Sequence, residues 1–414
     1  MRPFVLALCV LATATAAFAQ QQPRRYRLER IVVEGSRIDD TIVRGEARLE
    51  EEKMYGDEDF QQAVYRVRRL PFVTDAIYRL EPGVTAGGTT LVIRILDVAP
   101  VFYDLNGTGT RLADGETERD GTAILGARWQ LANLGVIEGA VEKSDVGEGI
   151  NVGLAYRAYD IMGTGGFGSV AIAQRFKTEL RDYDPTMAIT LGYPLTQRQT
   201  VTLTAAQIGS SVTTDFDVNN DDDDDDDDDT DRDDNRDLTN SDAFTFASLR
   251  WWYETIDDPF FATRGVQISG GPTWSHADFA IDRYDVTEDD DVATTELSTD
   301  AYGLAFDASG YRKFFGRTVG FLRLSGNGTQ NQESEAETLS GAARAGLAFD
   351  FHSQAENVLR PFKARLEIGA AFLASQLNQP NLPEVSLNNA AAEAAFVLRH
   401  RWGTVRLTGT YVNE

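Results

Sequence analysis

Histidine and cysteine, which often serve as catalytic bases and nucleophiles, are scarce in this sequence. The only histidines are His276, His352 and His400, and the only cysteine is Cys9. A hydrolase needs a nucleophile beside a base, but no histidine stands in a recognisable serine–histidine or metal-ligand pattern and no G-x-S-x-G motif occurs. We therefore expect neither enzymatic activity nor a cofactor, and we expect the histidines to lie on the wall or rim of the fold.

Cation binding is the other chemistry that the sequence suggests. Residues 221–229 are all aspartate, inside a longer Asp-rich stretch over residues 215–242. Carboxylate oxygens suit Ca²⁺, so Asp221, Asp223 and Asp225 are candidate ligands for weak binding. The stretch lacks the glycine turn and the final glutamate of an EF-hand loop, and its like charges repel and cannot be buried. The default prediction is a solvated, disordered loop without a specific metal site.

The first residues predict export from the cytoplasm. Arg2 supplies a positive start, residues 4–17 are apolar, and residues 17–19 read Ala-Phe-Ala, the small-x-small pattern of a signal-peptidase site. Residues 1–19 are therefore expected to be a signal peptide. Cys9 lies inside it, so the mature chain is expected to have no disulfide and no thiolate nucleophile.

Charge and hydropathy exclude further classes of protein. The net charge of −26 argues against a nucleic-acid partner, because binding phosphates requires a basic surface. Beyond the signal, no apolar stretch reaches the ~18 residues that a membrane helix needs. The mean hydropathy of −0.31 fits a soluble protein. It fits a membrane barrel equally well, because only every second residue of a barrel strand faces lipid.

Hydrophobic periodicity separates these two possibilities. From about residue 150 onward, large apolar side chains alternate with small or polar ones, as Val152, Leu154 and Tyr156 do with their neighbours. A period of two places each set on one face of an extended strand. The same alternation recurs at residues 169–176, 187–193, 347–351 and 404–411.

Segment length and aromatic placement favour a membrane. The segments run about 9 to 12 residues, longer than the ~5–6 of soluble strands and suited to a tilted bilayer crossing. Aromatic residues gather near segment ends, as in the interfacial girdles of membrane barrels: Trp251, Trp252, Tyr253, Tyr311, Phe314, Phe315 and Tyr411. We therefore expect residues 100–414 to form a transmembrane antiparallel β-barrel surrounded by outer-membrane lipid.

The connections support the same layout. Short turns at residues 193–198, 259–264 and 312–317 alternate with long polar segments at residues 215–242, 279–299, 326–338 and 378–388, which are expected to be extracellular loops. About twelve strands are expected after residue 150. Weaker candidates at residues 101–108, 122–131 and 136–143 raise the number to roughly 14–16, in an ordinary even-numbered barrel.

Residues 24–99 show a different sequence pattern, which predicts a small α+β domain. Residues 26–34 are β-prone, and Asp39 or Asp40 can cap a helix that follows. Asp57 can cap a second helix, whose residues Phe60, Val64 and Val67 share one face. Residues 72–80 and 90–98 read as two strands, so the expected order is β-α-α-β-β.

These residues resemble a known domain. Residues 31–35 (Ile-Val-Val-Glu-Gly), the segment 60–70 and residues 80–83 (Leu-Glu-Pro-Gly) look like a POTRA domain (polypeptide-transport-associated). A POTRA domain ahead of a barrel is similar to the outer-membrane assembly-factor superfamily, which includes BamA, TamA and the two-partner secretion transporters. The carried-over motif positions are Gly35, Pro82, Gly83, Asp258, Arg264 and Gly265, the last three in a loosely spaced D-x-x-x-x-P-x-R-G junction. The V-R-G-F/Y inward loop of the family has no counterpart from residue 326 onward.

The resemblance implies a Gram-negative outer-membrane protein with a periplasmic N-terminal domain. It implies insertion or assembly of outer-membrane proteins, or polypeptide translocation. Unfolded outer-membrane or exported polypeptides would be the partners, with periplasmic chaperones as further candidates. Two alternatives remain at this point: a two-partner secretion transporter for one exported protein, and a passive porin-like channel.

Overall fold

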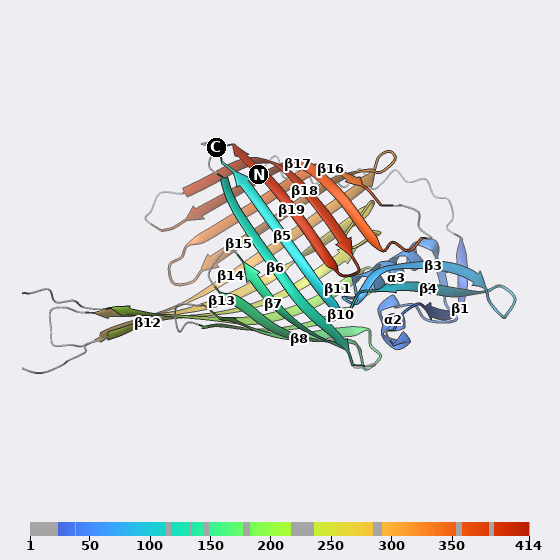
Figure 1. Ribbon diagram of the computed structural model, residues 1–414, viewed down its shortest axis with the longest axis horizontal. Coiled ribbons are helices and arrows are strands. Elements are labelled where there is room, and N and C mark those ends of the chain that lie inside the picture. Colours follow the sequence, from blue (N-terminus) through green and yellow to red (C-terminus); the bar gives the residue numbers. More distant parts are fainter. Residues whose placement is uncertain are drawn as a thin grey trace, which may run out of the picture.

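The computed structural model describes residues 24–37, 39–112, 117–131, 135–144, 149–176, 183–216, 236–284, 292–352, 358–380 and 385–413. The expected signal peptide and the candidate Ca²⁺ ligands Asp221, Asp223 and Asp225 lie outside these residues. The described chain forms a small N-terminal α+β domain followed by a large barrel (Figure 1).

The N-terminal domain has the expected β-α-α-β-β order with one addition, the short strand β2. Its elements are β1 (Arg25–Glu34), α2 (Asp40–Ala47), β2 (Met54–Gly56), α3 (Asp57–Arg69), β3 (Val73–Pro82) and β4 (Gly88–Asp97). The strands lie in the order β2-β1-β4-β3, with β1 parallel to β4 and β3 antiparallel to β4. Among the described residues, β3 pairs on one side only and is therefore an edge strand.

The two helices begin where side chains can accept their first N–H groups. Asp39 caps α2 as predicted, because its carboxylate accepts a bond from the Thr41 N–H at 2.8 Å. The predicted Asp57 cap of α3 is wrong by one residue. Gly56 is the N-cap, and the Asp59 carboxylate accepts from its N–H at 2.9 Å, since only a backbone is needed there once Asp59 supplies the acceptor. Phe60 of α3 is fully buried in the domain core.

The second body is a closed barrel of fifteen strands. They are β5 (Val101–Arg111), β6 (Thr117–Gln130), β7 (Val136–Ser144), β8 (Ile150–Ile161), β9 (Gly166–Phe176), β10 (Tyr183–Pro194), β11 (Gln199–Phe216), β12 (Arg236–Glu254), β13 (Gly265–Tyr284), β14 (Val292–Lys313), β15 (Thr318–Asn331), β16 (Glu337–Asp350), β17 (Phe362–Asn378), β18 (Val385–His400) and β19 (Gly403–Asn413). The total lies within the predicted range, and β8 to β19 are the twelve strands expected after residue 150. The expectation of an even number is wrong. Neighbouring strands are antiparallel except at the closure, where β19 pairs with β5 in parallel, as an odd number requires.

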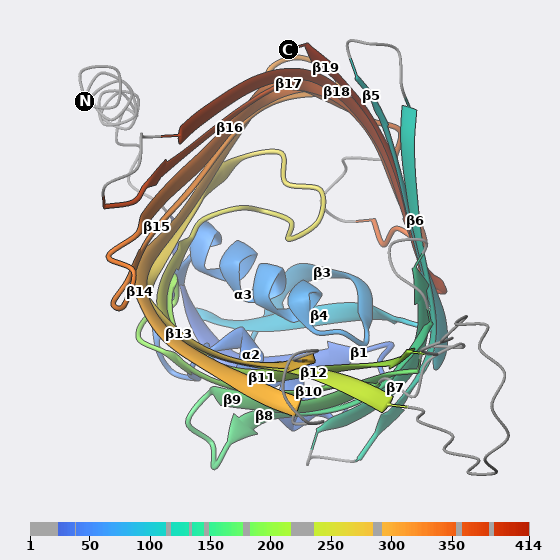
Figure 2. The same cartoon turned by 90° about the vertical axis from the view of Figure 1, so that its left-hand side faces the viewer.

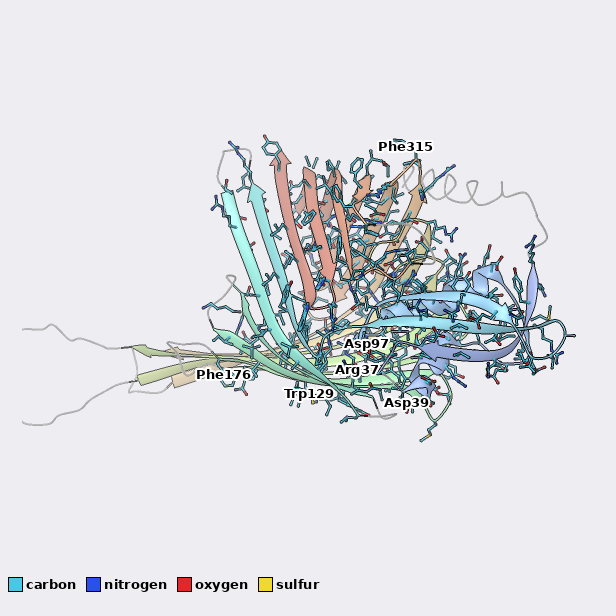
Figure 3. All side chains as sticks on the ribbon, turned by 45° about the vertical axis from the view of Figure 1, so that its right-hand side comes forward. Arg37, Asp39, Asp97, Trp129, Phe176 and Phe315 are labelled. Atoms are coloured by element: carbon cyan, nitrogen blue, oxygen red, sulfur yellow. The ribbon has the colours of Figure 1, made fainter. Side chains whose placement is uncertain are left out.

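The outside of the barrel carries the predicted apolar belt. Alternate residues of β8, β9 and β10 expose large apolar side chains, each between 36% and 52% accessible: Val152, Leu154, Tyr156, Val170, Ile172, Met187, Ile189 and Leu191. Trp129, Phe176 and Phe315 also project from the barrel (Figure 3). A soluble protein does not expose so continuous an apolar surface, whereas a barrel in lipid must. The barrel is therefore a transmembrane barrel.

The long polar connections are shorter than predicted, because strand pairing continues into the polar segments. The β11–β12 ladder runs to Phe216 opposite Arg236, so only residues 217–235 of the Asp-rich segment lie outside the described chain. Strands also occupy most of residues 279–299 and 326–338, and they occupy residues 378 and 385–388 of the segment 378–388. Backbone pairing between strands does not require apolar side chains, so the β11–β12 hairpin extends well beyond the shorter strands of the barrel (Figure 1).

Candidate functional site

The N-terminal domain closes much of one mouth of the barrel. Looking along the barrel, α3 lies across the opening, and the chain that joins β12 to β13 curves into the lumen above it (Figure 2). We call this connection, residues 255–264, the plug turn. Its side chains Ile256, Asp258 and Phe261 are almost completely buried. Two segments thus lie across much of the mouth, and their contacts with the barrel wall form the candidate site.

A buried cluster of four charged groups joins the domain, the plug turn and the wall. The Lys363 ammonium of β17 lies 2.6 Å from Asp258 Oδ2 and 3.0 Å from Asp75 Oδ1. Arg68 of α3 lies 3.2 Å from Asp75 Oδ1 and 3.8 Å from Asp258 Oδ2. Lys363 is only 2% exposed and Asp75 is fully buried. Charges at such depth are tolerated only when they are paired, as these are.

Local structure explains how Asp75 reaches this cluster. The β3–β4 ladder shifts register between Val73 and Asp75, an irregularity that re-aims the side chains that follow. Both Asp75 oxygens are used, because Oδ2 accepts a bond from the Arg360 N–H at 3.0 Å. The start of β3 therefore forms its polar contacts with the barrel wall and not with water.

A second layer of contacts holds the tip of the plug turn. Arg365 of β17 binds both carboxylate oxygens of Asp350, at 2.6 and 3.1 Å, and donates to the Ala262 carbonyl at 3.0 Å. Its guanidinium lies 5.5 Å from the Phe261 ring, and the His352 ring meets Phe261 edge-on at 5.3 Å. Phe261 therefore anchors the turn in a pocket with one cationic wall and one aromatic wall.

The plug turn also carries its own internal supports. Asp258 Oδ1 accepts from the N–H groups of Phe260 and Phe261, at 3.0 and 2.9 Å. Asp257 accepts from the N–H and the hydroxyl of Thr263, at 2.8 and 2.6 Å. Gly265 ends the turn with a φ of +100°, and a Cβ there would lie 2.4 Å from the Thr255 carbonyl oxygen. The glycine is required at this position because no larger residue fits.

Burial and neighbouring charge act in opposite directions on the acids and bases of this site. Burial alone would raise the pKa of Asp258, but the Lys363 ammonium and the Arg68 guanidinium outweigh it and hold that pKa well below its usual range. Burial lowers the pKa of His352, whose Nδ1 lies 3.1 Å from the Ala364 carbonyl oxygen. At neutral pH the site therefore contains an ionised aspartate and a neutral imidazole.

A separate set of contacts fixes α2 and α3 to the β10–β11 turn. Arg66 is 3% exposed and donates to the backbone carbonyls of Glu46 and Ala47 and to the carbonyl and side chain of Gln197. Burial lowers the pKa of Arg66 to about 9, so its charge persists at neutral pH. Arg69 forms an ion pair with Glu254 at 2.6 Å. The domain is therefore held at several points around the mouth.

The second feature of functional interest is the seam between β19 and β5. The two strands pair in parallel over nine positions, from Gly403 opposite Tyr103 to Tyr411 opposite Arg111. The Thr404 N–H donates to Asp104 Oδ1 at 2.9 Å. Gly403 has a φ of +153°, and a Cβ there would lie 1.6 Å from the Tyr103 carbonyl oxygen. The seam is thus a backbone ladder that begins at a very close approach of the two chains.

The six motif positions that the family resemblance suggested lie in two separate parts of the structure. Gly35 follows β1 with a φ of +79°, and Pro82 and Gly83 lie at the tip of the β3–β4 hairpin, away from the mouth. Asp258 lies in the buried cluster. Arg264 lies beside it in the plug turn, donating to Gln61 at 2.8 Å, and Gly265 ends that turn.

Sequence reasoning missed the partners of Asp258. These are Arg68 and Lys363. Also missed were Asp75, which shares both cations, and Arg365 in the second layer. One signal could have found two of them. Lys363, Arg365 and Glu367 alternate along one strand and so share a face that points into the barrel, where charged residues need partners.

The histidines lie at three unrelated places. His352 packs in the mouth, His276 lies between Asp278 and Asp300 at 3.0 and 2.9 Å, and the His400 Nδ1 accepts from the Trp402 N–H at 3.4 Å. Within the described ranges, no three His, Cys, Asp or Glu residues are arranged to hold a metal ion. No helix of the described chain is long and apolar enough to span a bilayer.

Comparison with known proteins finds similar folds among solved structures. No protein-family profile and no curated protein matches the sequence. Among solved structures, the chain is similar to BamA from Haemophilus ducreyi lacking POTRA domains 1–3, with 13% identity and a TM-score of 0.42 over 94% of this chain and 81% of that one. It is similar to CdiB from Escherichia coli, with 12% identity and a TM-score of 0.48 over 94% of this chain and 73% of that one. For CdiB from Acinetobacter baumannii, the identity is 9% and the TM-score 0.47 over 90% of this chain, which spans only 60% of that protein. The solved structures that this chain resembles thus include BamA and CdiB barrels.

Proposed function

We propose that this protein is an outer-membrane factor that inserts or assembles outer-membrane proteins, with its N-terminal domain in the periplasm. The observation that carries the proposal is the parallel closure of the barrel. In an up-and-down barrel every neighbouring pair is antiparallel, so fifteen strands force one parallel pair, and this is β19–β5. One further strand, placed between them and antiparallel to both, would give an even and fully antiparallel barrel. The seam is therefore a place where an incoming strand can pair on both sides.

The energetics of the seam favour such an exchange. A parallel pair is slightly less stable per residue than an antiparallel pair. Side-chain packing on the outward face of the seam is also sparse, because Gly107 and Gly109 of β5 and Gly409 of β19 have no side chains to contribute there. Since backbone groups of any sequence can replace those of a neighbouring strand, capture here would not depend on one particular client.

The N-terminal domain supplies a second edge for capture. The first half of β3, Val73–Ile77, is buried, whereas Arg79, Glu81 and Pro82 are exposed. β-augmentation by an extended polypeptide is therefore open only along the outer half of β3, next to the β3–β4 hairpin. A client bound there would lie on the periplasmic side, before it reaches the seam.

A disulfide across the seam tests the proposal. Gly109 and Gly409 are direct register partners, so the Gly109→Cys/Gly409→Cys variant should lock β5 to β19. In proteoliposomes supplied with urea-unfolded outer-membrane proteins, we expect the oxidised variant to lose insertion and the reduced variant to regain it. The matched control is Gly107→Cys/Gly121→Cys, which joins β5 to β6 at another register pair and should leave insertion unchanged. Equal insertion by the oxidised and reduced seam variant would refute the proposal.

Depletion in cells distinguishes the two alternatives. Misassembly of several barrel proteins fits an assembly factor, whereas loss of one exported protein alone fits two-partner secretion. A passive channel should conduct small solutes, and deletion of residues 22–100 should leave it conducting. The packing of α3 and the plug turn across the mouth does not favour a passive channel.

A further inference from the structure

Two adjoining cavities, of about 510 and 400 Å³, lie against the part of the barrel wall that is formed by β12–β18. Asp307, Ser325 and Ala342 border both of them, so the two cavities form one groove, which we call the lumenal groove. Along β14, the alternate residues Tyr302 and Leu304 are exposed on the outer face, so Asp307 lies on the opposite, lumenal face. Each volume falls within the ~300–1,000 Å³ that is usual for small-molecule sites.

The charged side chains of the lumenal groove are balanced. Each of its three arginines is paired with a carboxylate of the same wall: Arg250 with Asp307 at 3.0 Å, Arg323 with Glu367 at 2.8 Å and Arg344 with Glu393 at 3.2 Å. The groove therefore has no excess charge of either sign, which favours a neutral ligand over an ion. A guanidinium carries five N–H groups and a carboxylate accepts several hydrogen bonds, so each pair still has donors and acceptors to offer.

Uncharged polar groups and two aromatic rings complete the lining. Four of its polar side chains form no hydrogen bond within the described chain: Ser309, Ser325, Ser375 and Asn389. The two rings belong to Trp252 and Tyr311. The Trp252 indole N–H donates to Thr202 Oγ1 at 3.0 Å, which fixes the orientation of that ring. The lining thus combines unused hydrogen-bonding groups with aromatic surfaces.

We propose that the lumenal groove binds a neutral oligosaccharide. A sugar hydroxyl both donates and accepts hydrogen bonds, so it can use guanidinium donors and carboxylate, amide or hydroxyl acceptors that lie side by side. The face of an aromatic ring is negative and attracts the polarised C–H groups of a sugar ring, a contact that Trp252 and Tyr311 can supply. Asp307 borders both cavities and is therefore the central acceptor. The site is independent of the proposed function, since it needs neither the seam nor a client.

Titration calorimetry on the full chain, in micelles of a detergent without a sugar headgroup, tests the site. Maltotriose, cellotriose and triacetylchitotriose are titrated separately, with glycerol as the control for hydroxyl groups that are not on a ring. We expect saturable binding of at least one trisaccharide and none of glycerol. The neutral tripeptide Gly-Ser-Gly is the rival ligand. Saturable binding of the tripeptide alone, or of no ligand at all, would overturn the proposal.

Substitution of Asp307 locates the binding. Asp307→Ala removes a charged acceptor, so the affinity for the trisaccharide should fall by about tenfold. The fold should persist, because the side chains of Arg250 and Asp307 are 28% and 49% exposed and such a pair contributes little to stability. The matched control is Glu142→Ala, which removes the same charge from β7, a strand that does not line the groove. Equal weakening by Glu142→Ala would contradict the proposal.

Tryptophan emission provides a second, local readout. A sugar that contacts Trp252 should shift the emission of the wild-type chain with the same midpoint as the calorimetric titration. Trp252→Phe keeps an aromatic ring, so binding should persist in that variant while the shift disappears. The other four tryptophans stay in place and serve as the internal control. A shift that survives in Trp252→Phe, or binding without any shift in the wild type, would place the ligand elsewhere and contradict the proposal.

Discussion

We call the place where the N-terminal domain and the plug turn meet the barrel wall the mouth junction. The mouth junction and the seam both join parts of the chain that are far apart in sequence, but by different kinds of contact. At the junction, buried side-chain charges meet: Asp75, Asp258 and Lys363 are each at most 3% exposed. At the seam, the backbones of β5 and β19 meet over nine positions, flanked by glycines and threonines. Side-chain charges specify one partner, whereas backbone groups accept any strand. The junction is therefore built to hold one arrangement, and the seam is built to allow exchange.

Ion pairs across the lumen wall extend this contrast. Arg250 pairs with Asp307, Arg323 with Glu367 and Arg344 with Glu393. Each pair skips one strand, linking β12 to β14, β15 to β17 and β16 to β18. Between β19 and β5, no ion pair occurs among the described residues. The braced wall lies on the side of the plug turn, and the unbraced closure lies at the seam.

The largest effect is expected from removal of the lysine at the junction. Lys363→Met leaves Asp75 and Asp258 buried with Arg68 as their remaining cation, and breaking a buried pair in this way costs about 3–5 kcal/mol. The domain should undock, which spin labels at Val84→Cys and Phe315→Cys would report as a broadened distance distribution. Arg312→Met is the control and should leave the distance unchanged. An unchanged distribution for Lys363→Met would mean that the charges do not hold the domain.

The sequence predicts the elements on both sides of this comparison better than it predicts their contacts. The alternation of Val152, Leu154 and Tyr156 correctly indicates strands with one apolar face, because that period is a local property of the chain. The apolar stripe of Phe60, Val64 and Val67 likewise identifies the buried face of α3. Both patterns depend only on neighbouring residues.

The partners at the junction depend on distant residues. Asp258 meets a lysine 105 positions later in the chain, and only the closed barrel and the docked domain bring the two together. The motif resemblance pointed to Asp258 without indicating its partners. The parallel seam was missed for a similar reason, since it follows from the total strand number, which short polar segments leave uncertain.

The next largest effect on the docking of the domain is expected when the pH is lowered. The pKa of Asp258 is lowered in the folded state, so this group stabilises the junction above its unfolded pKa of about 3.9 and loses that contribution as the pH falls below it. The loss is smaller than for Lys363→Met, because Lys363 keeps Asp75 as a partner. The spin-label distance should therefore begin to broaden below about pH 4 and broaden further as the pH falls towards the lowered pKa of the folded state. Asp258→Asn retains the oxygen that caps Phe260 and Phe261 and should weaken this acid dependence. An equally steep dependence in that variant would assign the transition to other groups.

A smaller, local effect is expected at the seam. Gly403→Ala places a Cβ against the Tyr103 carbonyl oxygen in a strained backbone conformation, which costs about 1–3 kcal/mol. Hydrogen exchange should become faster in β19 and β5 and stay unchanged in β12–β17. Gly409→Ala is the matched control, because a Cβ there has its nearest atom, the Ala394 carbonyl oxygen, at 4.0 Å. Faster exchange around the whole barrel would show that the seam is not an independent unit.

The smallest effect tests whether ion pairs stabilise the barrel wall or whether the backbone hydrogen bonds between its strands do so alone. Arg344 and Glu393 have side chains that are 41% and 20% exposed, so solvent screens their attraction and Arg344→Gln should cost at most about 1 kcal/mol. Glutamine keeps much of the volume and a hydrogen-bonding group, which isolates the charge. Exchange in β16–β18 should rise slightly and should depend on salt in the wild type but less in the variant. Arg406→Gln on β19, where the described chain supplies no carboxylate partner, should change neither quantity. If both variants behave alike, the braces contribute nothing measurable, and the contrast between wall and seam rests on the direction of strand pairing alone.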